Sequence, residues 1–283
     1  MNPPTVKTIG DPSDSEWLFR LSQQISQLSQ AALLSKTERA DFESRRMRLI
    51  EILRQCKDAR RQLIQLVAEH IGQVAEGKGV FVDSTGVLII EDDIVPRLNR
   101  AVNDFFVSAR TALYHLFGQK PVGGKKPTKS ILEILTGFNF GFVFIFDSAR
   151  FEQAAKQYIE RLLGFRSRAL IDVIRSDRET WSLGLQEIRD RIIHDTEYDG
   201  LKMVYKANGN NVAIGFPRLN GARMLDFVEM FWNNLIDSSE EVILLALCTR
   251  MPPLVAVARI PPNEWDPTLP FRWRGILLDH PTP

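Results

Sequence analysis

The chain has 283 residues, of which 44% are hydrophobic and 25% are charged, and 36 basic side chains face 35 acidic ones. This composition suits a globular protein of one large or two smaller domains and excludes disordered, collagen-like and disulfide-rich chains. A net charge of +1 excludes a uniformly basic coat for nucleic acid but allows a local basic groove. The two cysteines form no Cys/His ligand pattern, so we expect no structural zinc site, and a reducing compartment is compatible.

The chain shows no pattern for targeting or membrane insertion. Residues 1–15 are rich in prolines and acids, which predicts a disordered leader rather than a secretory signal. The most apolar stretches, 137–146 and 242–248, are much shorter than the roughly 20 residues that cross a bilayer as a helix. We therefore expect a cytoplasmic protein with no membrane contact.

Apolar residues recur at spacings of three and four, which predicts a mainly α fold, a helical bundle with a long N-terminal helical segment. The predicted helices cover 16–34, 38–76, 94–118, 130–135, 147–163, 166–194 and 223–249. Thr37 is expected to cap the second of them, and the sixth is expected to break near Ser176. Arg46 and Arg60 interrupt the heptad seam of the second helix, which favours packing against the rest of the protein over an extended coiled coil.

Turn residues predict two short β-hairpins, over 80–90 around Asp83 and over 201–216 around Gly209. A lysine-rich loop spans 119–129, and the phenylalanine-rich stretch 137–146 is expected to be buried as helix or strand. Prolines after residue 251 exclude a regular helix, so this tail is expected to lie extended, with Trp265 and Trp273 as anchors. The predicted organisation is a leader (1–15), an N-terminal helical segment (16–79), a helical domain with hairpin insertions (80–250) and a proline-rich tail (251–283).

Common catalytic and metal-binding motifs are absent from the sequence. The segment GGKK at 123–126 lacks the spacing of a phosphate-binding loop, and no GxSxG, HExxH or kinase signature occurs. The acidic run at 91–93 is interpreted as the solvated start of a helix, with a metal cluster as the alternative. We therefore predict no metal site and no cofactor.

The segment 185–195, LQEIRDRIIHD, is the one constellation that suggests chemistry. On an ideal helix Arg189 and His194 are about 140° and roughly 7.5 Å of rise apart, so they do not face each other. Asp190 and His194 are four residues apart on one face, where the carboxylate can hold the imidazole. Arg189 therefore meets His194 only if the helix ends there or if a symmetric dimer brings two copies together.

This segment resembles the Rx4-6H signature of the HEPN (higher eukaryotes and prokaryotes nucleotide-binding) superfamily, in which a polar residue commonly follows the arginine and aliphatic residues precede the histidine. Arg189, Asp190 and His194 match it residue by residue. The resemblance implies a HEPN-like helical bundle, a homodimer, and in many members a metal-independent endoribonuclease with a role as a toxin or in antiviral defence. It therefore also implies RNA as substrate and an antitoxin or defence-system partner.

The chemistry of RNA cleavage assigns a role to each residue of the motif. Histidine exchanges protons near neutral pH, which suits His194 as acid/base. Arg189 is permanently charged and forked, so it is expected to bind the phosphate, while Asp190 orients the histidine or supports the dimer cleft. Supplementary RNA contacts are predicted for Arg191, Lys202 and Arg110. A second Rx4H pair, from Arg110 to His115, fits the signature less well. His115 is expected to line the same RNA-binding groove as the preferred motif.

Three other interpretations remain open. The motif is alternatively a helix end, where the arginines make surface ion pairs and His194 suits the C-terminal dipole. The bundle alternatively binds RNA or a nucleotide without cutting it. In the third interpretation the chain is an interaction scaffold, because nine basic and five acidic residues lie between Lys36 and Arg61. Such a charge run is also typical of an ordinary solvated helix face.

Overall fold

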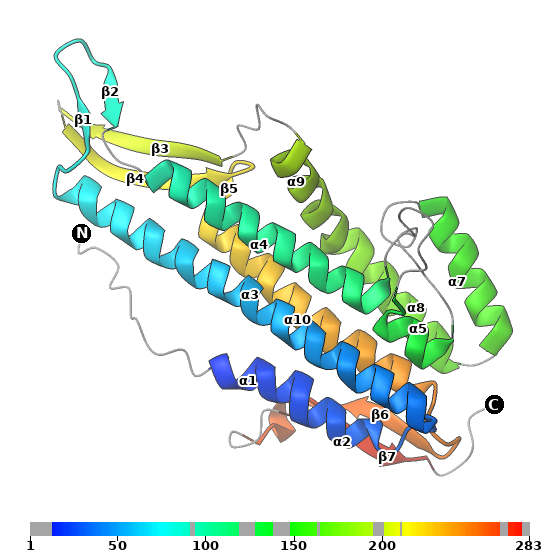
Figure 1. The fold of residues 1–283 in the computed structure, drawn as a ribbon. Helices are drawn as coiled ribbons and strands as arrows, with labels where there is room; N and C mark the ends of the chain where they lie inside the picture. Colours follow the sequence, from blue (N-terminus) through cyan, green and yellow to red (C-terminus); the bar gives the residue numbers. More distant parts are fainter. Residues whose placement is uncertain are drawn as a thin grey trace. The chain divides into compact units, whose positions relative to one another are not determined.

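A computed structural model of the chain describes residues 13–90, 94–118, 128–137, 148–162, 165–194, 201–209, 211–266 and 271–278. The fold is mainly α, as the apolar spacing predicts, with small antiparallel sheets (Figure 1). The phenylalanine-rich stretch from residue 138, the lysine-rich loop up to residue 127 and the acidic run 91–93 lie outside the described residues. Within the described part of the chain, no helix has the length and apolar character needed to span a membrane.

The chain folds into two compact units, each assembled from segments that are far apart in sequence. Unit 1 comprises Met1–Ile50, His115–Ser176 and Ile236–Pro283. Unit 2 comprises Glu51–Tyr114 and Asp177–Leu235. The boundaries between the units fall inside the helices α3 (Lys36–Ala75), α4 (Ile94–Phe117), α8 (Phe165–Asp177) and α10 (Met224–Cys248).

The first described segment of unit 1 is one helical run. It consists of α1 (Ser13–Phe19), a π-helical turn (Arg20–Gln24) and α2 (Ile25–Ser29). Trp17, Leu21 and Ile25 recur every four residues on its inner side, and all three are buried. The run begins before the predicted residue 16 and ends before the predicted residue 34, but it is helical as expected.

Helix α3 begins at Lys36, two residues before the predicted start, because Ser35 caps it and not Thr37. The Ser35 hydroxyl accepts a hydrogen bond from the Glu38 N–H at 3.2 Å, and the Glu38 carboxylate accepts one from the Ser35 N–H at 2.8 Å. This reciprocal pair is a capping box, whose S-x-x-E pattern is visible in the sequence. The prediction of Thr37 as the cap was therefore wrong.

The arginines that interrupt the predicted seam of α3 have acceptors within the protein. In unit 1, Arg46 is 5% exposed, and its Nη1 donates to the carbonyls of Leu21 at 3.0 Å and Ser22 at 2.9 Å. In unit 2, Arg60 pairs with Glu229 at 2.6 Å. A buried cation needs such partners, and these contacts explain why α3 carries arginine where a coiled coil would need apolar residues.

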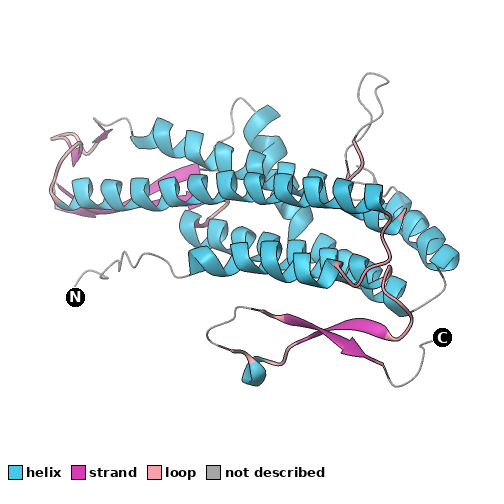
Figure 2. Ribbon diagram, turned by 60° about the horizontal axis from the view of Figure 1, so that its bottom comes forward, coloured by secondary structure: helices cyan, strands magenta, loops and turns pink. Residues whose placement is uncertain are grey.

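The C-terminal tail of unit 1 forms a third hairpin rather than a simple extended strap. Strands β6 (Val255–Arg259) and β7 (Trp273–Leu277) pair antiparallel, and a 3₁₀ turn (Pro262–Glu264) lies between them in sequence (Figure 2). Trp273 is 9% exposed and is confirmed as an anchor. The same prediction for Trp265 was wrong: this side chain is 41% exposed, and its ring stacks on the Arg272 guanidinium at 5.1 Å.

The other helices described in unit 1 are α5 (Ile131–Thr136), α7 (Ser148–Leu162) and α8 (Phe165–Asp177), whose last residue belongs to unit 2. At the start of α8, the guanidinium of Arg166 donates to five backbone carbonyls at the end of α10 and just beyond it. These acceptors are Cys248, Met251, Pro252, Pro253 and Val255. One cation thus donates to carbonyls of a helix end and of its proline-containing continuation, where the regular helical pattern of N–H donors has ended.

Replacing Arg166 with alanine is expected to lower the free energy of unfolding by about 2–3 kcal/mol, because hydrogen bonds from a charged donor contribute about 1.5–3 kcal/mol. Arg168, which is exposed on the same helix, is the matched control, and its replacement is expected to stay within about 0.5 kcal/mol. Urea unfolding of both variants checks the prediction. Equal losses would contradict it.

Both predicted hairpins belong to one sheet in unit 2. Strands β1 (Val80–Val82) and β2 (Leu88–Ile90) form the first hairpin, and β3 (Leu201–Asn208) and β4 (Asn211–Leu219) form the second. The strand order is β2-β1-β4-β3, and the short β5 (Ala222–Arg223) pairs with β4. The Asp83 carboxylate fixes the first turn by accepting the N–H groups of Thr85 and Val87. Gly209 in the second turn has a φ of 61°, which favours glycine.

The helices of unit 2 confirm the predicted apolar faces. Phe105 and Phe106 of α4 are fully buried, and Phe106 meets Phe231 of α10 edge to face at 5.6 Å. The helical run that begins with α8 does not break near Ser176 as predicted. It continues through a π-helical turn (Arg178–Ser182) into α9 (Leu183–His194). A π-helical turn is wider than an α-helical one, but backbone hydrogen bonding continues through it, so the helix is not interrupted.

Candidate functional site

Helix α9 of unit 2 carries the motif that the sequence singles out. Leu185 and Ile188 are buried and fix the inner side of the helix. Arg189 and Asp190 follow, with 21% and 41% of their side chains exposed. His194 is the last residue of α9, and its side chain lies outside the described part of the structure.

Asp190 connects two arginines from different helices of unit 2. Its Oδ1 atom accepts a hydrogen bond from Arg189 Nη1 at 2.8 Å and another from Arg110 Nη1 of α4 at 2.6 Å. Charge-assisted bonds of this length are stronger than neutral ones. Two cations and one anion leave the cluster with a net charge of +1, which suits the binding of a phosphate.

Tyr114 completes this cluster. The guanidinium of Arg110 lies 5.2 Å from the centre of its ring, one helical turn along α4. Burial raises the pKa of the Tyr114 phenol, while the positive charges of Arg110 and Arg189 act in the opposite direction. The ring therefore lies close to both cations and stays a neutral phenol at physiological pH.

The structure gives Asp190 and Arg110 contacts that the sequence did not predict. The carboxylate that was expected to hold His194 accepts bonds from the two arginines. Arg110 was predicted as an RNA contact, but only 7% of it is exposed. Its guanidinium therefore has little surface for a nucleic acid and is better placed to act through Asp190.

The other predicted RNA contacts do not join this cluster. Arg191 on α9 and Lys202 on β3 are exposed. His115 is assigned to unit 1 and is half-buried near the end of α4. Burial lowers the pKa of His115 to about 4, and the positive charges of Arg45 and Arg48 add to this effect. His115 is therefore neutral at physiological pH and adds no charge for RNA binding.

The lowered pKa of His115 predicts a pH dependence of stability. The folded protein disfavours the proton that the unfolded chain accepts below the ordinary value of 6.5, so this contribution is complete above pH 6.5 and is lost as the pH falls toward about 4. His115→Asn is expected to lose less stability than the wild type between pH 7 and pH 4.5. Urea midpoints at the two pH values test this, and equal losses in both proteins would contradict it.

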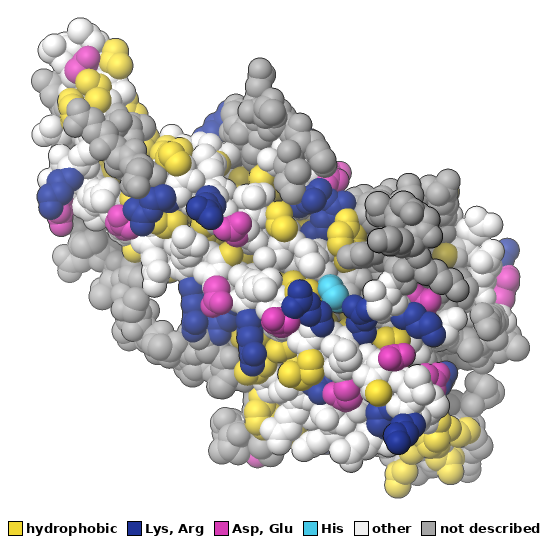
Figure 3. Space-filling model, viewed as in Figure 1, with side chains coloured by type: hydrophobic (Ala, Val, Ile, Leu, Met, Phe, Trp, Pro, Cys, Tyr) yellow, Lys and Arg dark blue, Asp and Glu magenta, His cyan; other side chains and the backbone are white. Residues whose placement is uncertain are grey.

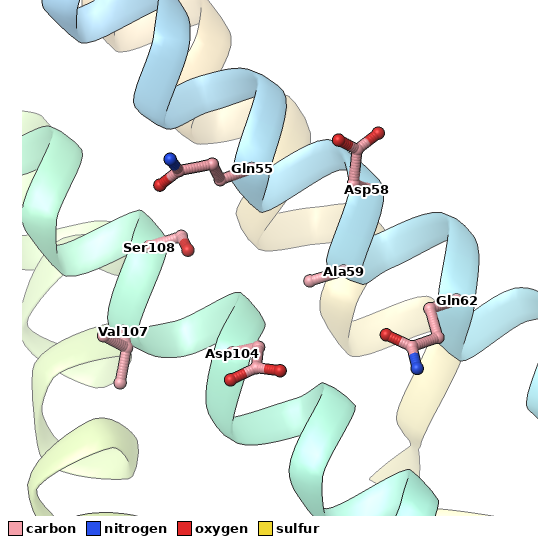
Figure 4. A pocket seen from close by; sticks show the side chains of 7 residues that line it. All are labelled: Gln55, Asp58, Ala59, Gln62, Asp104, Val107 and Ser108. Carbon is pink, nitrogen blue, oxygen red and sulfur yellow. The ribbon is translucent and has the colours of Figure 1, made fainter.

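A polar groove between α3 and α4 in unit 2 encloses about 380 Å³, and none of the predicted site residues lines it. Gln55, Gln62 and Asp104 extend into the space between the two helices (Figure 4). Two aspartates line this groove, but among the described residues no group of three or more His, Cys, Asp or Glu side chains is placed to hold a metal ion.

The basic run on α3 does not form a surface of one sign. Dark blue basic side chains alternate with magenta acidic ones along this helix (Figure 3). In the unit 2 part of α3, exposed Arg54 and Arg61 are interspersed with exposed Glu51 and Asp58. Such mixing is typical of a solvated helix face and weakens the scaffold interpretation based on charge.

Sequence reasoning missed two residues of the cluster region, Tyr114 and Gln186. Gln186 is 1% exposed, and its amide atoms have no hydrogen-bond partner among the described residues. It precedes Asp190 by four positions, so both lie on one face of α9. The spacing of four that relates Tyr114 to Arg110 and Gln186 to Asp190 was available in the sequence, but only the contact between the helices gives it meaning.

Comparisons with the profiles of known protein families, with curated proteins and with solved structures give no match for this chain.

Proposed function

We propose that this protein is a metal-independent endoribonuclease of the HEPN type, with Arg189 and His194 at its active site. The observation that supports this proposal is the contact of Asp190, which holds the Arg189 guanidinium at 2.8 Å beside the buried Arg110. A cation fixed before the substrate arrives stabilises developing negative charge without reorganisation during the reaction. The resemblance of residues 185–195 to the Rx4-6H signature supplies the reaction class.

In the proposed reaction His194 removes the proton from an RNA 2′-hydroxyl, and the 2′-oxygen attacks the adjacent phosphorus. The bond from phosphorus to the 5′-oxygen breaks, and this oxygen takes up a proton from an imidazolium. Arg189 binds the non-bridging phosphate oxygens, on which negative charge increases. The products are a 2′,3′-cyclic phosphate and a 5′-hydroxyl, and neither water nor a metal ion is consumed.

The proposal includes a homodimer, because Arg189 and His194 do not face each other on a regular helix. Two copies of α9 across a shared cleft would present an arginine of one protomer to a histidine of the other. Exposed Arg191 and Lys202 are proposed to contact the RNA backbone near that cleft. A toxin or antiviral-defence role, with an antitoxin or defence-system partner, is part of the same proposal.

The test is cleavage of mixed RNA by the purified full chain in the presence of a chelator, with analysis of the RNA ends. We expect cyclic phosphate ends in the presence of the chelator. His194→Ala is expected to lower kcat by about 10²-fold or more, since acid/base groups contribute about 10²–10⁴-fold. Arg189→Ala is expected to lose about 10²–10³-fold, the usual effect of removing a group that stabilises an oxyanion.

Arg100→Ala is the matched control, because Arg100 is exposed on α4 and is not part of the cluster. It is expected to cleave like the wild type. Cleavage that disappears with the chelator, or that persists in both motif variants, would overturn the proposal. RNA binding without cleavage by the wild type would instead favour the non-catalytic binding alternative.

A further inference from the structure

We propose that Arg110 positions Arg189 for the reaction by holding the carboxylate of Asp190, an inference that rests on the proposed function. Arg110 is 80 residues from Asp190 in sequence and donates to it at 2.6 Å. The same oxygen of Asp190 accepts Arg189 at 2.8 Å. Arg110 therefore acts on the proposed active site through Asp190, without touching the substrate itself.

The geometry of α9 explains why a third residue is needed. Adjacent residues on a helix project about 100° apart and do not face each other, so the contact between Arg189 and Asp190 requires both side chains to lean together. With 41% of its side chain exposed, Asp190 has water as a competing partner. The bond from Arg110 restricts Asp190 to the rotamer that also receives Arg189.

Arg110 is suited to this role because it is itself held in place. Only 8% of its side chain is exposed, and its planar guanidinium lies over the ring of Tyr114. A lysine would keep the charge, but its ammonium is a point charge without a planar face to stack on the ring. Arg110→Lys therefore keeps the positive charge and removes the planar guanidinium, so its effect reports on the geometry of Arg110 and not on its charge.

The arrangement leaves donors of Arg189 for the substrate. Its contact with Asp190 uses Nη1 and its Nε is buried, so the donors left for a substrate are those of Nη2 and the second N–H of Nη1. A guanidinium held by one nitrogen can present its remaining N–H groups to two phosphate oxygens. A displacement of the guanidinium by about 1 Å would be enough to lower the rate by up to about 10²-fold.

The first test is kinetic. Arg110→Lys is expected to lower kcat for RNA cleavage by about 10- to 100-fold, with a smaller change in KM. The reason is that a misplaced Arg189 stabilises the transition state less well, while the binding of the substrate is less affected. In an Arg189→Ala background the same substitution is expected to cause no further loss, because residues that act as a unit are not additive. Additive losses would overturn the inference. Arg100→Lys on the same helix is the control.

The second test does not depend on activity. In ¹⁵N spectra of the arginine Nε–H groups, the Arg189 signal is identified by its loss in Arg189→Lys. We expect this signal to be observed in the wild type and in Arg100→Lys, and to be lost through faster exchange with water in Arg110→Lys and Asp190→Asn. Asp190→Asn is the second variant because the side chain of Asp190 is partly exposed, so its replacement is expected to destabilise the fold less than the replacement of the buried Arg110.

The two tests separate failure of the inference from failure of the proposed function. A wild type that leaves RNA intact removes the ribonuclease proposal, and the spectra still decide whether Arg110 orders Arg189. A wild type that cleaves RNA, with an unchanged Arg189 signal in both Arg110→Lys and Asp190→Asn, removes the positioning role alone.

Discussion

Replacing Glu240 with alanine is expected to lower the free energy of unfolding by about 3–5 kcal/mol, because it leaves a buried cation without its main partner. Glu240 on α10 has 2% of its side chain exposed, and Arg20 in the first π-helical turn has 5%. The Glu240 carboxylate accepts Arg20 Nε at 3.0 Å and also accepts Arg20 Nη2 and the Gln24 amide. Burial acts to lower the pKa of Arg20, but its carboxylate partners outweigh this and raise it.

Asp237 is the matched control in the same network. It accepts Arg20 Nη2 at 2.6 Å, but 51% of its side chain is exposed. Solvent screens such a pair, so Asp237→Ala is expected to cost about 1 kcal/mol or less. Urea unfolding compares the two variants, and a cost for Glu240→Ala no larger than that for Asp237→Ala would contradict the prediction. The double variant Arg20→Met with Glu240→Leu is expected to recover much of the loss, since it leaves no unpaired buried charge.

This network also marks the limit of what the sequence could predict. Periodicity places the helices that carry Arg20 and Glu240, because apolar spacing is a local property. The pair itself joins positions 220 residues apart, and charged residues on a helix are usually solvated. Arg20 and Glu240 become a buried pair only because the helices of unit 1 pack against each other.

The proposed active site shows the same limit: residues close together in sequence can be recognised as a group, but contacts between distant residues cannot. The motif in α9 was found because Arg189, Asp190 and His194 lie within six consecutive residues, so their spacing is directly visible. The bond from Arg110 was missed as a contact within the protein, since α4 and α9 are distant in sequence. Arg110 was instead predicted to contact RNA, because a guanidinium can bind the phosphates of a nucleic acid.

The hairpins show which local signals were sufficient. Asp83 and Gly209 fixed both turns, because an aspartate that accepts nearby N–H groups and a glycine at positive φ are local requirements. That both hairpins share one sheet, joined where Phe81 pairs with Asn211, was not predictable from alternation alone. Trp265 was wrongly predicted as an anchor for a related reason, since aromatic character does not distinguish a core position from a ring stacked on Arg272.

Gly215→Ala is expected to lower the free energy of unfolding by about 1–3 kcal/mol, the usual cost of overpacking. Gly215 of β4 lies directly opposite Tyr205 of β3. A Cβ at this position would come within 2.8 Å of Tyr205 Cε1 and 2.9 Å of His70 Nε2. His70 is fully buried and meets the Tyr205 ring edge-on at 5.8 Å, so the imidazole has little free space to move into.

Gly72→Ala separates this clash from the general effect of adding a methyl group. Gly72 lies inside α3, and a methyl group added there would meet no atom within 4 Å, so alanine is expected to raise stability by up to about 1 kcal/mol through helix propensity. Urea unfolding of both variants should therefore give shifts of opposite sign. In a Tyr205→Val background the cost of Gly215→Ala should shrink, because the nearest clashing atoms are gone. A cost that is unchanged in this background would show that Tyr205 is not what excludes a side chain at position 215.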